Sequence, residues 1–90
     1  MKYRRLNSFK RDLDALPLEI QELVGKKFQL FQNDPGHPSL RVKKMKGHES
    51  VWEGHITTGC VFTFHYETDE SGEQVVVFRR IGSHTIYRKP

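Results

Sequence analysis

The sequence predicts an α+β fold, in which two N-terminal helices pack on one face of a small, mainly antiparallel four-stranded sheet. Apolar residues recur at helical spacing through the first third of the chain. Three later runs are rich in Val, Ile, Phe, Tyr, Trp and Thr and are separated by turn residues, as is typical of strands. These runs are residues 51–56, 60–66 and 75–81. We expect a single domain over residues 1–90, because shorter halves could not bury a useful core.

The expected order of elements begins with a short strand over residues 1–6, followed by a helix over residues 9–16. Ser8 precedes this helix, and its hydroxyl is expected to cap it by accepting a hydrogen bond from an N–H of the first turn. Pro17 should end this helix and begin the next, because a proline lacks the N–H that the start of a helix does not use.

The second helix is predicted by a continuous apolar stripe that should face the sheet. The stripe consists of Ile20, Leu23, Val24, Phe28 and Phe31. On the sheet it should meet residues such as Trp52, Phe62, Phe64 and Val76. Gly25 lies inside this helix and costs about 1 kcal/mol relative to Ala, unless close packing on the sheet requires it. The run NDPGHP at residues 33–38 ends the helix.

Two of the five histidines are candidates for chemistry. His55 ends the first strand of the predicted meander and His84 follows the third, so an antiparallel arrangement places both on one small surface. Two imidazoles that titrate near neutrality can act as base and acid in phosphodiester cleavage. The other histidines have simpler interpretations: His37 and His48 lie in loops, and His65 is expected to face solvent from a strand.

The sequence contains no recognisable metal site. No pair of histidines has HxxxH or HxH spacing, and Cys60 is the single cysteine, so we expect no metal and no cofactor. One cysteine also excludes an intrachain disulfide framework and is typical of a reducing cytosol. Because no apolar run approaches the roughly 20 residues of a spanning helix, we expect a cytoplasmic protein without membrane contact.

The chain is basic, with a formal net charge of +4, which favours a polyanionic partner. Four positive charges fall close together after the second helix, with no acid between Pro35 and His48. They belong to Arg41, Lys43, Lys44 and Lys46. One interpretation is a solvated edge that lysines protect from aggregation. The other is a surface that follows the phosphates of a nucleic acid.

Several short motifs, taken together in order, resemble the RelE/ParE toxin superfamily. They are L16-P17-L18-E19-I20, D34-P35-G36-H37-P38-S39-L40, K44-M45-K46-G47, V51-W52-E53-G54-H55-I56 and R79-R80-I81-G82-S83-H84. The likeness covers nearly the whole chain. It is greatest to the RelE branch of type II toxin–antitoxin systems and, within it, to a His-bearing subgroup similar to YafQ.

This resemblance implies a small toxin that a cognate antitoxin protein holds inactive. When freed, such a toxin enters the ribosomal A site and cleaves mRNA by attack of a 2′-OH on the adjacent phosphate. Two alternatives remain open. A ParE-like protein would inhibit DNA gyrase without chemistry of its own, and a degenerate toxin would bind only antitoxin or RNA.

The resemblance also assigns roles to individual residues. The subgroup has a histidine at the position of His55 and another in an R-x-G-x-H pattern, which residues 80–84 match. Arg80 is therefore the counterpart of a residue that steadies the scissile phosphate. His84 is expected to be the general acid and His55 the base, and Tyr87 is expected to stack on a base of the RNA.

The chain departs from its apparent relatives at two places. The subgroup has an aspartate where this chain has Gly59, and other relatives have an aromatic–arginine pair where this chain has Cys60 and Val61. Both departures remove charged groups that these relatives use near the phosphate. We therefore expect His55 and His84 to be the remaining proton carriers.

Overall fold

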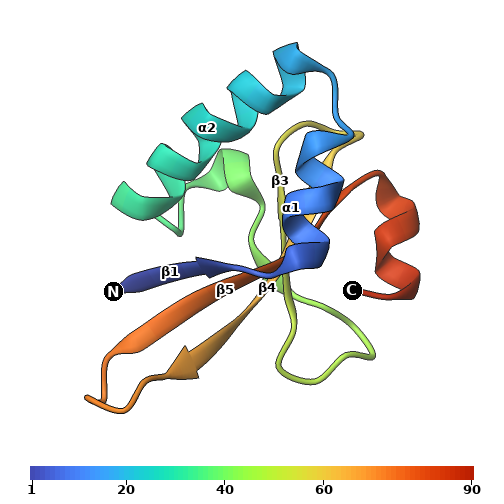
Figure 1. Cartoon of the computed structure of the whole chain (residues 1–90). Helices are drawn as coiled ribbons and strands as arrows, with labels where there is room; N and C mark the ends of the chain where they lie inside the picture. Colours follow the sequence, from blue (N-terminus) through green and yellow to red (C-terminus); the bar gives the residue numbers. More distant parts are fainter.

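The computed structural model describes residues 1–90 and confirms the predicted α+β architecture (Figure 1). The helices and strands are β1 (Lys2–Arg5), α1 (Asn7–Asp14), α2 (Leu18–Asn33), β2 (Lys43–Lys44), β3 (Trp52–His55), β4 (Val61–Thr68) and β5 (Gln74–Gly82). Two short 3₁₀ helices, η1 (Pro38–Leu40) and η2 (His84–Arg88), complete the chain. None of the helices is long and apolar enough to cross a membrane.

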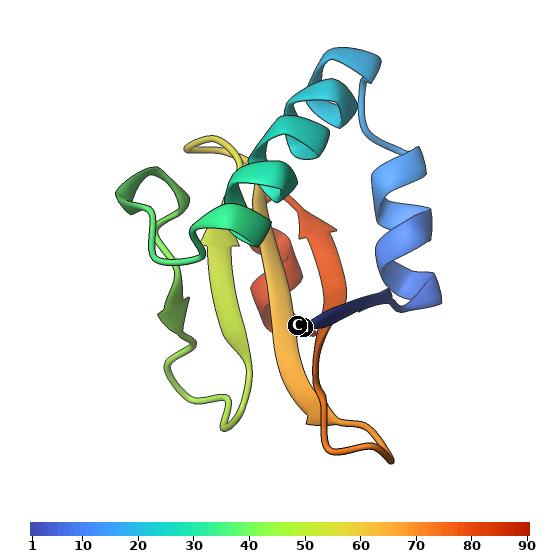
Figure 2. The ribbon, with the colours of Figure 1, turned by 90° about the vertical axis from the view of Figure 1, so that its left-hand side faces the viewer.

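The sheet has five strands in the order β1-β5-β4-β3-β2, one more than expected. The additional strand is β2, in which two residues of the basic run pair with β3. β1 is parallel to β5 at one edge, and all the other neighbours are antiparallel. Figure 2 shows α2 crossing in front of the sheet and the C-terminal segment lying behind it. The sheet is therefore covered on both faces.

The core lies between the helices and the sheet, as the apolar stripe of α2 predicted. Val24 and Phe31 are buried, and Phe28 is half-buried within a cluster of aromatic rings. The ring of Phe28 stacks on Phe78 at 4.4 Å and meets the edge of Phe62 at 5.2 Å, measured between ring centroids. Aromatic packing therefore fixes α2 across the middle of the sheet.

The role predicted for Ser8 is wrong. Leu6 is the N-cap of α1, which has no side-chain cap, and Ser8 lies inside the helix. Its hydroxyl instead donates to the carbonyl of Arg79 at 2.7 Å. The helix begins at Asn7 because the backbone leaves β1 directly, with the Leu6 N–H donating to the carbonyl of Phe78 in β5. Ser8 therefore joins α1 to the sheet and does not cap the N-terminus of the helix.

The two glycines of interest occupy opposite environments. Gly25 is exposed on α2, and a Cβ atom there would have no neighbour within 4 Å, so packing on the sheet does not require it. Gly54 is buried in β3, and a Cβ atom there would lie 2.4 Å from Cζ of Phe62. The glycine at position 54 therefore lets β3 lie flat against a core aromatic ring.

His65 does not face solvent as expected. Its imidazole lies between Arg79 Nη1 at 2.9 Å and Glu67 Oε2 at 2.8 Å, with its side chain 17% exposed. Thr63 is fully buried on the same face, where its hydroxyl donates to the backbone oxygen of Pro90. The C-terminal segment covers this outer face of the sheet, which the strand pattern alone did not predict.

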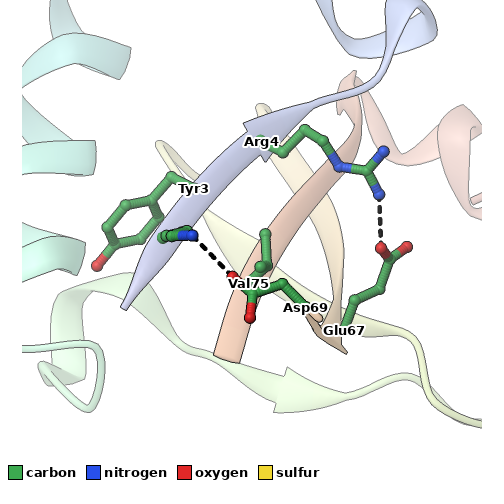
Figure 3. A pocket seen from close by; sticks show the side chains of 6 residues that line it. Tyr3, Arg4, Glu67, Asp69 and Val75 are labelled. Carbon is green, nitrogen blue, oxygen red and sulfur yellow. Dashed lines mark hydrogen bonds and ion pairs between the residues drawn. The ribbon is translucent and has the colours of Figure 1, made fainter. Parts of the chain in front are cut away.

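Ion pairs connect β1 to the β4–β5 hairpin. Lys2 Nζ lies 2.8 Å from Asp69 Oδ2, and Arg4 Nη2 lies 2.7 Å from Glu67 Oε1 (Figure 3). The hydrogen bond from Lys2, with further bonds from the side chain of Ser71 and the backbone N–H of Glu73, lowers the pKa of Asp69 to about 2. Ion pairs this exposed contribute little to stability, so the edge strand is held mainly by its parallel pairing with β5.

Candidate active site

A hollow of about 560 Å³, the largest on the molecule, opens on the outer face of the sheet between β2, β3 and η2. It is lined by Arg41, Val42, Lys43, Glu53, His55, His84 and Tyr87. Trp52 and Gly54 contact the helix-side core. Because successive strand residues point to opposite faces, Glu53 and His55 are directed to the outer face.

The structure brings His55 and His84 together in this hollow. Their ring centroids lie 6.1 Å apart with the planes inclined by 65°. His84 Nε2 lies 3.0 Å from the carbonyl oxygen of Thr58, which can only accept, so Nε2 carries a proton. Nδ1 is then the atom of His84 that gains and loses a proton. Tyr87 packs edge-on against His84, with 5.3 Å between the ring centroids.

His55 is held in its neutral form. Burial is the main cause that lowers its pKa below 6.5, and the charge of Glu53 opposes this effect. Arg41, His84 and Lys43 lower the pKa further. In addition, Nδ1 of His55 is buried without a hydrogen-bond partner, so an imidazolium there would leave a donor unsatisfied. At neutral pH His55 is therefore ready to accept a proton.

The basic run divides between the two faces of the sheet. In the β2–β3 register, Lys43 lies opposite Glu53 and Lys44 lies opposite Trp52. Lys43 therefore reaches the hollow, where its Nζ is 3.8 Å from Glu53 Oε1, whereas Lys44 is directed to the helix side. Lys46 is exposed and does not line the hollow. The four basic residues are thus not one continuous patch.

Arg41 has an unusual backbone conformation at the mouth of the site. It follows η1 with φ 49° and ψ 42°, in the left-handed region that costs a residue with a side chain of the order of 1–3 kcal/mol. Arg41 and His55 also border a second hollow of about 210 Å³, whose other lining residues are Ser39, Thr57 and Thr58. Arg41 therefore borders both hollows.

Glu53 is a further site residue, which the sequence motifs did not single out. It is buried, with 7% of its surface exposed, and its Oε1 accepts a hydrogen bond from the Tyr87 hydroxyl at 3.2 Å. Burial, followed by the charge of Glu53 and this hydrogen bond, raises the pKa of Tyr87 to about 12. The strand pattern does place Glu53 beside His55, because residues two apart in a strand share one face of the sheet.

Arg80 lies away from the hollow. Its Nε is 2.6 Å from Asp12 Oδ2 and its Nη2 is 3.2 Å from Oδ1, so α1 holds the guanidinium in a bidentate ion pair. Its Nη1 donates to the carbonyl of Lys89 at 3.2 Å. The pair with Asp12 raises the pKa of Arg80. The cations that line the hollow are Arg41 and Lys43.

No protein-family model matches this sequence, and no curated protein matches it. Solved structures do match its fold. A YoeB/ParE toxin from Agrobacterium tumefaciens is 18% identical with a TM-score of 0.73, and the match covers 93% of this chain and 99% of that one. RelB–RelE, an antitoxin–toxin complex from Methanococcus jannaschii, is 21% identical with a TM-score of 0.70. This match covers 97% of this chain and 99% of that one.

YafQ from Escherichia coli gives a TM-score of 0.73 at 12% identity, with 96% of each chain covered. The chain has the RelE-like fold. The expected architecture is thereby confirmed by structures that share only 12 to 21% of its residues. Because the RelE, YoeB/ParE and YafQ structures match almost equally well, the comparison does not distinguish among these subgroups.

Proposed function

We propose that this chain is the toxin of a type II toxin–antitoxin pair in the RelE/ParE superfamily, and that it cleaves mRNA on the ribosome. The observation that carries the proposal is the pair of imidazoles 6.1 Å apart in a hollow bordered by Arg41 and Lys43. The RelE-like fold and the ordered motifs of the sequence support it. A ParE-like inhibitor of gyrase would leave the two histidines without a role.

Cleavage would require two proton transfers, one from the attacking 2′-OH and one to the leaving 5′-oxygen. His55, neutral at the start, takes the proton of the 2′-OH, and the 2′-oxygen forms a bond to the adjacent phosphorus. The bond from phosphorus to the 5′-oxygen breaks, and Nδ1 of a protonated His84 gives that oxygen its proton. The products are a 2′,3′-cyclic phosphate and a 5′-hydroxyl. Each group contributes about 100- to 10,000-fold to such a rate.

The geometry of the pair suits one phosphate. Both rings line one hollow, with 6.1 Å between their centroids. The proposal places a single phosphodiester between them, with one of its oxygens beside each ring. In contrast with His55, His84 is exposed, so the acid that must be recharged after each turnover has access to solvent.

Positive charge beside the phosphate would stabilise the transition state. In the proposal, Arg41 and Lys43 supply it from the rim of the hollow, and they also bind the RNA backbone. Arg80, to which the resemblance gives this role, would have to release Asp12 first. Lys44 and Lys46 would attract RNA at longer range, and Tyr87 would offer a ring on which a base stacks.

The cognate partner in this proposal is a small antitoxin protein. An acidic segment laid over Arg41, Lys43 and the hollow would neutralise the site and block access of RNA. The M. jannaschii neighbour is itself an antitoxin–toxin complex. Co-expression with the adjacent reading frame should relieve growth arrest and yield a purified complex.

The proposal is tested by inducing the chain in cells and mapping new mRNA 5′ ends. We expect new ends within translated regions, and far fewer when the same message lacks a start codon. His55→Ala and His84→Ala should remove these ends, whereas His48→Ala, outside the hollow, should retain them. New ends that do not depend on translation would contradict the ribosomal step, and growth arrest without any new ends would contradict the nuclease.

A further inference from the structure

Glu53 is an unexpected residue in a site that would bind a polyanion. It is a buried acid that lines the same hollow as both histidines, so it would repel any phosphate placed beside it. Its nearest cation is Lys43, whose side chain is 70% exposed and 3.8 Å distant. Ion pairs with such an exposed partner contribute little. Lys43 therefore does not account for a buried carboxylate at this position.

The free acceptor of Glu53 faces the hollow. Oε1 receives the Tyr87 hydroxyl, which fixes the orientation of the carboxylate. Oε2 receives no hydrogen bond from the protein. It is nevertheless not fully buried, because the only fully buried side-chain nitrogen or oxygen without a partner is Nδ1 of His55. Oε2 is therefore open to the hollow, where a ligand can donate to it.

The surroundings of Glu53 suit a nucleobase. Val42 and the ring of Tyr87 supply apolar surface in the same hollow, and flat bases stack on such surfaces. A base held there would present its Watson–Crick edge to an acceptor that has no donor of its own. We propose that Glu53 makes this hollow selective for a base with an amino group, guanine above all, and against uracil.

The hydrogen-bond donors on the base edges explain why guanine should bind best and uracil worst. Guanine presents two neighbouring donors, N1–H and the 2-amino group, and one can bond to Oε2 while the other bonds to the second lone pair of Oε1, beside the Tyr87 hydroxyl. Cytosine and adenine each present one amino group, and acidic side chains accept from the cytosine amine. Uracil presents a single N3–H between two carbonyl oxygens, which a carboxylate repels. This inference rests on the proposed function for its RNA substrate, although base binding can be measured without cleavage.

The test is to titrate the purified chain with each of the four nucleoside 3′-monophosphates and to measure the four affinities by NMR. We expect guanosine 3′-phosphate to bind about tenfold more tightly than uridine 3′-phosphate, the discrimination typical of one bidentate pair. Glu53→Gln should reduce this ratio and improve uridine binding, because an amide can donate to a uracil carbonyl. Glu49→Gln, an exposed acid that does not line the hollow, is the matched control and should preserve the order of the bases.

Equal affinity for all four nucleotides, or no binding, would overturn the inference without need of any variant. Retention of the full preference in a folded Glu53→Gln protein would also overturn it. Failure of the proposed function is separable, since base selectivity in solution without cleavage of mRNA would contradict only the nuclease. Cleavage that depends on the histidines but ignores the base would contradict only the role of Glu53.

Discussion

His55 and His84 meet edge to face, 6.1 Å apart, because of the register of three strands. His55 lies opposite Val61 in β4, and Val61 lies opposite Gly82 in β5. His84 follows two residues after Gly82, at the start of η2. The hydrogen bond of its Nε2 to the Thr58 carbonyl then fixes the ring at this end of the sheet. The pairing thus depends on the strand register together with the β3–β4 turn that carries Thr58.

The first prediction concerns the protonation of His55, which NMR titration of its ring protons measures. Its pKa should lie below 6.5, mainly because of burial. Arg41→Gln should raise this pKa, because Arg41 lowers it, and Glu53→Gln should lower it, because Glu53 raises it. Shifts of the same sign in both variants would show that the charges of the hollow do not act on His55.

The same pKa has a consequence for stability. A pKa lowered by folding means that the unfolded chain binds the proton more readily. The contribution of neutral His55 is therefore fully present above about pH 6.5 and is lost as the pH falls through the folded-state pKa. Denaturant unfolding at a series of pH values should show a smaller loss in His55→Gln than in the wild type over this acidic range.

The second prediction separates the two neighbouring lysines of β2. Lys43→Ala should weaken binding to an RNA oligonucleotide and reduce the salt dependence by roughly 0.7 unit of slope, the value for one contact to a single strand. Lys44→Ala is the matched comparison and should reduce the affinity and the slope less, because its side chain lies on the helix-side face and attracts RNA only at longer range. Affinities at four salt concentrations measure both slopes. An equal effect of the two variants would show that the run acts as a diffuse charge instead.

The third prediction uses the two glycines. Gly54→Ala should lower the free energy of unfolding by roughly 1–3 kcal/mol, as overpacking does, because its Cβ would lie 2.4 Å from a ring atom of Phe62. Gly25→Ala should raise it by about 0.5–1 kcal/mol, because an exposed helix position gains helix propensity without any new contact. Urea denaturation of both variants measures these changes. A stable Gly54→Ala protein would contradict the packing of β3.

The fourth prediction addresses Arg80. If its role is to join α1 to β5, Asp12→Ala should lower thermal stability more than Arg80→Ala, because Asp12 Oδ2 also accepts from the Ile81 N–H at 3.1 Å. The double variant should then lose little more than Asp12→Ala alone. RNA cleavage by the folded fraction should then be retained in both. If Arg80 instead contacts the phosphate, Arg80→Ala alone should lose activity, and Asp12→Ala should keep or increase it. Melting curves and a cleavage assay together decide between the two.

Local patterns predicted most of the fold. The apolar stripe of α2 and the alternation of the strands determine which faces pack together, so these elements, and the meeting of His55 with His84, follow from spacing. The site was predicted less completely. Burial of Glu53 depends on η2 folding back over the sheet, and the engagement of Arg80 depends on the docking of Asp12. Neither long-range contact leaves a local signal in the sequence.

The central claim is that two histidines transfer protons in RNA cleavage, and the end groups of the product test it most directly. In a purified translation system, wild-type protein should leave a 2′,3′-cyclic phosphate upstream and a 5′-hydroxyl downstream of the cut. His55→Ala and His84→Ala, shown by circular dichroism to be folded, should each reduce the rate by about 100-fold or more. Wild-type rates in both variants, or a 5′-phosphate at the cut, would contradict the histidine mechanism.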